Sequence, residues 1–246
     1  MALDNLRQFI QAIDAAGDLV RIGRPVAIDR EITEIADRAM KSPGGGPALL
    51  FERPRLLTGA DARHPVAVNL FGSERRMTLA LGVERLDDIG DRIAELVHLK
   101  VPEGLLDKLA MLPKLAELAK FPPRSGGGRA PCQDLVVRGP DVDLGQFPVP
   151  VCWPGDGGPY ITLPQVITRD PRSGVRNVGM YRIQVIGPRE VAMHWQRHKV
   201  GAAHWRDMAA RGETMPVCIA LGGDPASVYS ASAPLPPTID EYLFAG

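Results

Sequence analysis

The stretch YITLPQVITRDPRSGVRNVGMYRIQVIGPREVAMHW, residues 160–195, decides the fold of this chain. It is rich in β-forming residues, and turns divide it into three predicted strands, over 160–168, 176–186 and 191–195. In the first turn, Asp170-Pro-Arg-Ser-Gly174, the proline presets its own φ angle and the glycine accepts a positive one. The pattern therefore predicts a hairpin that joins the first two of these strands.

The rest of the second half is also predicted to contain strands, together with helices. Strands are also predicted over 134–137 and 217–221, and a helix over 202–211. Asp224-Pro225 is typical of a helix start, with a capping aspartate and proline at the first helical position. The second half is thus predicted to be rich in sheet, with helices at its periphery.

Short helices and strands alternate in the first half. Helices are predicted after Asp4, over 29–40 and after residue 77, and strands over 19–22, 48–51 and 65–70; helical spacing returns over 105–120. Phe121-Pro-Pro-Arg-Ser-Gly-Gly-Gly128 is a domain boundary or an ordered surface loop. The predicted class is α+β, with an N-terminal α/β domain over 1–120 and a sheet-rich domain over 121–246.

Composition and charge limit the classes of partner and the cellular compartment that we expect for this protein. The 246 residues are 45% hydrophobic, and 29 basic residues balance 29 acidic ones, which gives no electrostatic argument for a nucleic-acid partner. Three widely spaced cysteines form no CxxC pair and indicate a reducing cytoplasm. The sequence shows no signal peptide and no run of apolar residues long enough to span a bilayer.

Four side chains supply the chemistry of a metal-bridged phosphate beside a carboxylate: Asn177, Arg182, His198 and Glu241. In a regular strand Asn177 and Arg182 would face opposite sides, and a bulge at Gly179 would bring them together. Each residue also has a structural interpretation, because the four types are common outside functional sites.

The structural interpretations are specific. Asn177 is typical of a strand-edge residue bonded to the turn backbone, and Arg182 of a surface salt bridge. His194 and His198 form an HxxxH pair, but the flanking residues indicate a strand and no HExxH is present, which argues against a zinc protease. Thr238-Ile-Asp-Glu241 matches a capping box, in which the glutamate caps a helix start.

Seven motifs, matched in order along nearly the whole chain, resemble the UbiD family of prenylated-FMN-dependent decarboxylases. They are Gly46-Pro-Ala-Leu-Leu-Phe-Glu52, Asn69-Leu-Phe-Gly-Ser-Glu-Arg75, Cys152-Trp-Pro154 with Asp156, Thr168-x-Asp-Pro-x-x-Gly174, Asn177-Val-Gly-Met-Tyr-Arg182, Gly222-Gly-Asp-Pro225, and Pro234-Leu-Pro236 through Glu241. An ordered set of this kind is far more specific than any one motif.

The resemblance implies a split β-barrel that holds prenylated FMN. It implies a divalent metal, usually manganese, with potassium nearby, and the metal would bridge the phosphate of the cofactor to Asn177, His198 and Glu241. By the same resemblance the cofactor is lined by Met180, Tyr181, Arg182, His194, Trp195, Gln196, Lys199 and Val200. Arg182 would also hold the carboxylate of the substrate, because a guanidinium pairs with a carboxylate bidentately and keeps its charge.

The implied activity is reversible decarboxylation of an aromatic or α,β-unsaturated acid. The neighbourhood of Asn177 and His194 looks most like the quinone-pathway branch, whose substrate is a 3-polyprenyl-4-hydroxybenzoate. A flavin prenyltransferase would supply the cofactor. We expect a cytoplasmic protein, peripheral to the membrane if its substrate is polyprenylated, and a homo-oligomer where the C-terminal domain of the family is present.

The chain also departs from the family. Family members run well beyond 246 residues, and their catalytic glutamate lies after the motif Phe244-Ala-Gly246. Without a proton donor the chain would be a fragment, a split subunit or an inactive relative. The rival function is therefore a non-catalytic subunit that binds the cofactor. A third alternative, a plain FMN oxidoreductase on a split barrel, would leave the metal ligands idle.

Overall fold

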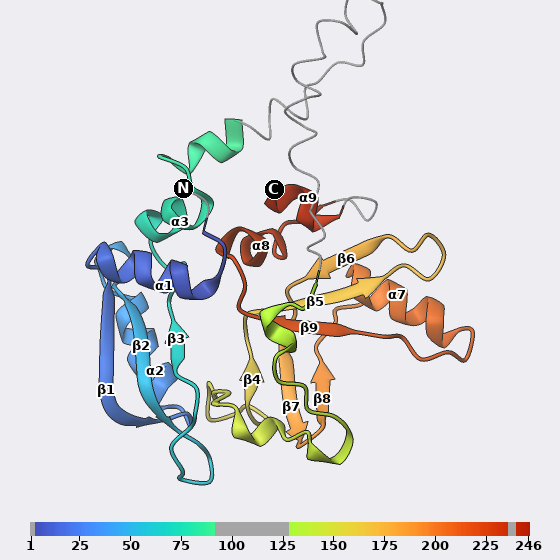
Figure 1. Cartoon of the computed structure of the whole chain (residues 1–246), viewed down its shortest axis with the longest axis horizontal. Helices are drawn as coiled ribbons and strands as arrows, with labels where there is room; N and C mark the ends of the chain where they lie inside the picture. Colours follow the sequence, from blue (N-terminus) through green and yellow to red (C-terminus); the bar gives the residue numbers. More distant parts are fainter. Residues whose placement is uncertain (1–2, 92–127, 236–239) are drawn as a thin grey trace, which may run out of the picture.

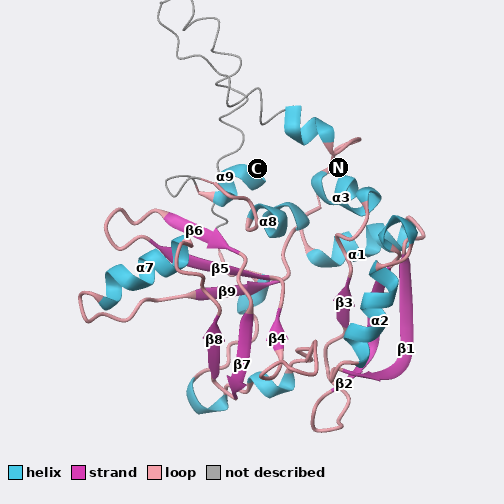
Figure 2. Cartoon of the chain, turned by 180° about the vertical axis from the view of Figure 1, so that it is seen from behind, coloured by secondary structure: helices cyan, strands magenta, loops and turns pink. Residues whose placement is uncertain are grey.

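The computed structural model describes residues 3–91, 128–235 and 240–246. Figure 1 shows an N-terminal group of helices and strands on one side and a second group, which includes the C-terminal helices, on the other; Figure 2 gives the reverse view. The described part contains helices and small sheets together, which confirms the predicted α+β class. The predicted boundary between residues 120 and 121 lies outside the described residues.

The N-terminal group is a small α/β unit. Its elements are α1 (Leu6–Ala15), β1 (Leu19–Ala27), α2 (Glu31–Met40), the 3₁₀ turn η1 (Pro43–Gly45), β2 (Ala48–Arg55), β3 (Val66–Val68) and α3 (Glu74–Leu81). β1 and β2 run parallel because α2 carries the chain back between them, and β3 pairs with β2 in the antiparallel sense. Phe9, Ile13 and Ala48 are fully buried in the core between α1 and the sheet.

The predicted elements of this unit are present, with small shifts at their ends. The helix predicted after Asp4 is α1, and its cap is Asn5, whose side chain accepts a hydrogen bond from the Gln8 amide at 2.9 Å. Gly17 has a φ angle of +73° just past the helix, a conformation in which glycine commonly ends a helix. β1 extends five residues beyond the predicted strand end at Ile22, and its register with β2 shifts after that residue.

Arg76 ties α3 to the start of β1. Its side chain is 1% exposed, and Nη1 donates to Asp18 Oδ2 at 2.7 Å. The Nε and Nη2 atoms of Arg76 are buried and have no hydrogen-bond partner among the described residues. The positive charge of Arg76 is therefore balanced by a single carboxylate, and the packing of α3 depends on that carboxylate.

The second group contains two three-stranded antiparallel sheets. Its elements are β4 (Tyr160–Ile161), β5 (Pro164–Arg169), β6 (Arg176–Gly179), β7 (Ile183–Gly187), β8 (Glu190–Met193), α7 (Val200–Ala209), β9 (Cys218–Leu221), α8 (Pro225–Ser230) and α9 (Glu241–Ala245). One sheet has the order β4-β7-β8 and the other β6-β5-β9. The buried residues Val166, Tyr181 and Ile183 form a core shared by both sheets.

The hairpin at 170–174 is confirmed. β5 and β6 pair antiparallel, the Gly174 amide donates to the Asp170 carbonyl, and Gly174 has a φ angle of +74°. The two long strands predicted over 160–168 and 176–186 are each split, and their halves belong to different sheets. Among the described residues of this second group, the hydrogen-bonded ladders form two separate sheets and do not close into one barrel.

The strand predicted over 134–137 is wrong. This segment is irregular and lies between the 3₁₀ turns Pro131–Gln133 and Gly139–Asp141. Its apolar side chains are exposed, with Leu135 at 81%. Apolar β-forming residues make a strand only where a neighbouring strand supplies hydrogen bonds, and none pairs with this segment within the described part. No described helix is both long and apolar enough to cross a bilayer.

We expect Asp18→Ala to destabilise the protein by about 3–5 kcal/mol, because it leaves the buried Arg76 charge uncompensated. Urea denaturation followed by circular dichroism measures this change. Asp87→Ala is the matched control, since Asp87 pairs with Arg85 where both side chains are more than 70% exposed, and such pairs contribute about 1 kcal/mol or less. Equal losses in the two variants would contradict the role assigned to the Arg76–Asp18 pair.

Candidate functional site

A polar cavity of about 520 Å³ opens where the chain leaves β6 and β8. The residues that line it are Met180, Tyr181, Arg182, His194, Trp195, Gln196 and Lys199. The His194 amide donates to the Arg182 carbonyl at 3.0 Å, which holds the two lining segments side by side. All seven are among the residues predicted to line the cofactor, so the fold gathers most of that set around one cavity.

Gly179 shapes one wall of this cavity. A Cβ atom at position 179 would lie 2.5 Å from the ring of Tyr181, so only glycine lets that ring fold back against β6. The Tyr181 hydroxyl accepts from the Gly201 amide in the first turn of α7 at 3.4 Å, and its ring meets Trp195 edge-on. The Trp195 Nε1 atom is buried without a partner among the described residues. Trp195 therefore keeps a spare hydrogen-bond donor in the cavity wall.

The bulge predicted at Gly179 is not present. β6 ends at Gly179 and β7 begins at Ile183, and the two strands belong to different sheets. Asn177 lies within β6 and is 5% exposed, whereas Arg182 is exposed in the connection and lines the cavity. A change of sheet, and not a bulge, accounts for their different directions. Arg182 forms no salt bridge within the described residues, so its structural interpretation is wrong.

Glu241 lies directly against β6. Its Oε2 atom accepts a hydrogen bond from the Val178 amide at 2.7 Å, and the residue is 7% exposed. The capping-box interpretation of Glu241 is wrong, because α9 begins at Glu241 and its cap is Asp240, which accepts from the Tyr242 amide. The Glu241 side chain therefore does not cap the helix. It bonds to β6 at Val178, the residue that follows Asn177.

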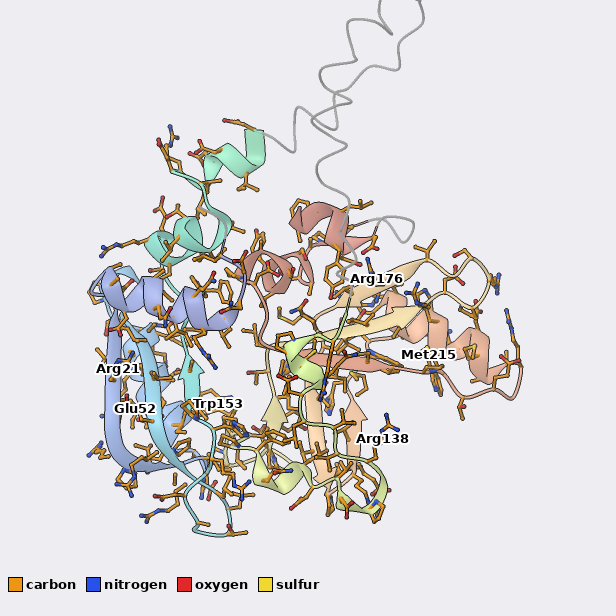
Figure 3. All side chains as sticks on the ribbon, in the orientation of Figure 1. Arg21, Glu52, Arg138, Trp153, Arg176 and Met215 are labelled. Atoms are coloured by element: carbon orange, nitrogen blue, oxygen red, sulfur yellow. The ribbon has the colours of Figure 1, made fainter. Side chains whose placement is uncertain are left out.

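Arg176 holds the residues on both sides of Glu241. Its Nε atom donates to Asp240 Oδ1 at 3.2 Å, and its guanidinium lies 4.4 Å from the centre of the Tyr242 ring. Arg176, labelled in Figure 3, is the first residue of β6. The start of α9 is therefore fixed to β6 by a paired charge, a cation–π contact and the Glu241–Val178 hydrogen bond.

A second set of contacts surrounds the Asn177 side chain. Asn177 Nδ2 donates to Thr168 Oγ1 at 3.4 Å, and Thr168 Oγ1 lies 3.0 Å from His204 Nδ1. All three side chains are buried. Asn177 is thus bonded to a side chain of β5 and not to the turn backbone. Sequence reasoning missed Thr168 and His204, although HxxxH followed by a further histidine in the predicted helix was a possible signal.

The remaining predicted site residues lie near the start of α7. His198 is exposed in the turn that precedes the helix, Lys199 is the N-cap residue, and Val200 is the first helical residue. Within the described residues no hydrogen bond joins His198 to Asn177 or Glu241. The structure therefore places Glu241 against the backbone amide next to Asn177 and places the third predicted metal ligand, His198, at the surface.

Comparison with known proteins gives the family. Residues 124–246 match the model of the 3-octaprenyl-4-hydroxybenzoate carboxy-lyase Rift-related domain, and residues 10–93 match that of the N-terminal domain of the same lyase. The chain belongs to the UbiD family. Uncharacterized proteins of Aquifex aeolicus and Archaeoglobus fulgidus are 47% and 45% identical over 98% and 100% of the chain. The chain spans about half the length of these curated relatives, 48% and 49%.

Solved structures of UbiD-class enzymes have the same fold. The enzyme HmfF of Pelotomaculum thermopropionicum in complex with FMN is 26% identical with a TM-score of 0.76, over 98% of this chain and 47% of that one. An evolved dimeric form of HmfF in complex with prFMN gives the same identity and TM-score. The vanillic acid decarboxylase of Sedimentibacter hydroxybenzoicus is 25% identical with a TM-score of 0.81, over 100% of this chain and 48% of that one.

Two buried groups of the site have shifted pKa values. Burial raises the pKa of Glu241, and the Val178 amide and nearby Arg176 offset only part of that rise. Burial lowers the pKa of His204 below the ordinary value of 6.5, although the nearby carboxylates of Asp170 and Asp207 oppose this effect. At neutral pH the His204 imidazole is therefore uncharged, which suits a hydrogen-bond acceptor.

The lowered pKa of His204 predicts a loss of stability in mild acid. The unfolded chain takes up this proton near pH 6.5 and the folded protein only at a lower pH, so the stabilisation is present above pH 6.5 and is lost as the pH falls through the folded pKa. Below pH 6.5 we expect the free energy of unfolding to fall with pH more steeply in the wild type than in His204→Gln, by up to about 1.4 kcal/mol per pH unit. Thermal unfolding at several pH values measures this difference. His64→Gln, at an exposed position, is the control and should behave as the wild type.

Proposed function

We propose that this UbiD-family chain takes part in the reversible, non-oxidative decarboxylation of an aromatic or α,β-unsaturated carboxylic acid with prenylated FMN and a divalent metal. The observation that carries the proposal is the joining of two features by one short strand. β6 holds Asn177 beside Glu241, and the chain that leaves β6 lines the polar cavity. An arrangement of this kind can hold the phosphate end and the ring system of one cofactor.

The cavity suits a flavin phosphate in charge and in donors. Arg182 and Lys199 bring two positive charges to it, and Lys199 precedes an α-helix of ten residues. The first turn of α7 contains no acidic residue, and its N-cap makes no side-chain hydrogen bond, which leaves the helix start suited to an anion. The unpartnered Trp195 Nε1 would find an acceptor on a bound ligand.

The metal would be held by Asn177 and Glu241, with His198 completing the set. An amide oxygen, a carboxylate and an imidazole, together with a phosphate oxygen, are ligands that manganese accepts. The raised pKa of Glu241 supports this assignment, because a buried carboxylate with one hydrogen bond is short of positive charge. A divalent cation would supply that charge and offset the phosphate.

Arg182 would bind and orient the acid. Its guanidinium is exposed in the cavity and has the planar fork geometry that can hold the departing carboxylate through two parallel hydrogen bonds. The bound cofactor would supply the electron sink for decarboxylation. Tyr181 and Trp195 pack one wall of the cavity and would exclude water from that side.

The substrate, the cellular location and the partners of the protein are also proposed. The family description names 3-octaprenyl-4-hydroxybenzoate, which supports a 3-polyprenyl-4-hydroxybenzoate as substrate. We further propose a role in ubiquinone biosynthesis. We propose a cytoplasmic protein, consistent with three free cysteines, which receives its cofactor from a flavin prenyltransferase and assembles as a homo-oligomer. The alternative is a subunit that binds the cofactor without turnover. Carbon dioxide release by the purified chain would separate the two.

The main test is cofactor retention. We expect the chain, co-produced with a flavin prenyltransferase and manganese, to show a bound modified-flavin spectrum and one manganese per protein. Asn177→Ala and Glu241→Ala should each lose most of both, since each removes a ligand. Glu213→Ala, at an exposed position, is a control that leaves both metal ligands in place. Full retention in both ligand variants would overturn the metal site.

Arg182→Ala should keep the cofactor and bind the acid about 10- to 100-fold more weakly, because a hydrogen bond to a charged group contributes about 1.5–3 kcal/mol. Isothermal titration of the loaded protein with a benzoate-type acid measures the affinity. Arg189→Ala, at an exposed position outside the cavity, is the matched control. Loss of cofactor with unchanged affinity for the acid would show that Arg182 serves the phosphate instead.

A further inference from the structure

A short chain of buried hydrogen bonds runs behind Asn177, from β6 through β5 to α7. Asn177 Nδ2 donates to Thr168 Oγ1 at 3.4 Å, and Thr168 Oγ1 meets His204 Nδ1 at 3.0 Å. Thr168 is 1% exposed, Asn177 5% and His204 7%. Three polar side chains with so little access to water have to satisfy one another, so their donors and acceptors are strongly constrained.

The constraint gives the chain a direction. A threonine hydroxyl has one proton and two lone pairs; its oxygen accepts from the Asn177 amide and also meets His204 Nδ1. A neutral His204 that carries its own proton on Nε2 would accept the hydroxyl proton at Nδ1. Its lowered pKa agrees with this state. The Asn177 NH₂ group is thereby fixed toward Thr168, and the amide oxygen is turned to the opposite side.

The direction of the amide matters for a metal. An amide oxygen binds a cation, whereas an NH₂ group presents hydrogen atoms and repels one. A terminal amide torsion has two broad orientations of similar intrinsic energy, so its surroundings decide which of them is populated. Among the described residues Thr168 is the only hydrogen-bond partner of the Asn177 side chain.

We propose that Thr168 and His204 are positioning residues, which orient the Asn177 amide so that its oxygen faces the metal. This inference rests on the proposed function, because it assumes that Asn177 is a metal ligand. Thr168 acts directly on Asn177, and His204 acts through Thr168 by taking the hydroxyl proton. The same histidine lies on α7, the helix whose start borders the cavity, so the orientation of Asn177 is coupled to the seating of that helix.

Manganese affinity is the first test. Thr168→Val keeps the shape and removes the hydroxyl, Thr168→Ser restores the hydroxyl, and Thr214→Val at an exposed position is the control. Binding is followed in the presence of FMN by the electron paramagnetic resonance signal of free aqueous manganese. We expect Thr168→Val and His204→Phe to bind manganese about 10- to 100-fold more weakly, with Thr168→Ser and Thr214→Val near the wild type. Wild-type affinity in Thr168→Val would overturn the proposal.

A second measurement separates this proposal from the metal site itself. In the metal-free protein, the Asn177 side-chain NH₂ resonances in a ¹⁵N spectrum report whether the amide is held. We expect slow hydrogen exchange in the wild type and in Thr168→Ser, and exchange at least tenfold faster in Thr168→Val. Equal exchange in wild type and Thr168→Val would overturn the positioning role. If the wild type binds no manganese, the proposed function fails, and the exchange data alone decide the positioning role.

Discussion

The hydrogen bond from the Val178 amide to the Glu241 carboxylate is the contact on which the site depends. It joins the C-terminal helix α9 to β6 across 63 positions of sequence, and it does so with a buried carboxylate. Burying a carboxylate is costly unless the group is paired or hydrogen-bonded, and one amide meets only part of that cost. The raised pKa of Glu241 is consistent with a desolvation cost that is only partly offset. The hydrogen bond and the raised pKa both support the proposal that a cation binds at Glu241.

The neighbouring residues make that contact possible. Arg176 sits where its guanidinium can pair with Asp240 and lie over Tyr242, so it fixes the residues on each side of Glu241. Three residues along β6 from Arg176, Gly179 gives the Tyr181 ring room to fold back. Val178 and Gly179 are adjacent in this four-residue strand, and they contact the Glu241 carboxylate and the ring of the cavity-lining Tyr181, respectively. The proposed metal ligands Asn177 and Glu241 and the wall of the cavity are therefore all connected to β6.

The sequence predicted much of this arrangement and failed where the contacts are long-range. Helical spacing, the turn at 170–174 and the Asp224-Pro225 helix start are local signals, and all three were confirmed. The strand predicted over 134–137 failed because strand formation needs a partner that local sequence does not reveal. The split of residues 176–186 was missed because a run of β-forming residues does not show where a chain changes sheet. The motif resemblance identified seven of the cavity residues, whereas spacing alone gave a bulge that is absent.

Local sequence also failed to predict the contact that Glu241 makes. Thr238-Ile-Asp-Glu241 fits a capping box by pattern, yet Asp240 caps the helix and Glu241 turns to β6. Both outcomes satisfy the local backbone, and only the approach of Val178 decides between them. Thr168 and His204 were missed for the same reason, since their bond spans 36 positions. The assignment of the site residues and of the two domains stays a prediction.

The most direct test is the position of the metal. Crystals of the chain grown with FMN and manganese would be measured at the manganese absorption edge, where the anomalous difference map marks the ion. The account predicts one strong peak within about 2.5 Å of an oxygen of both Asn177 and Glu241, on the side of β6 that faces the cavity. A peak elsewhere, with Glu241 still bonded only to the Val178 amide, would contradict the central claim.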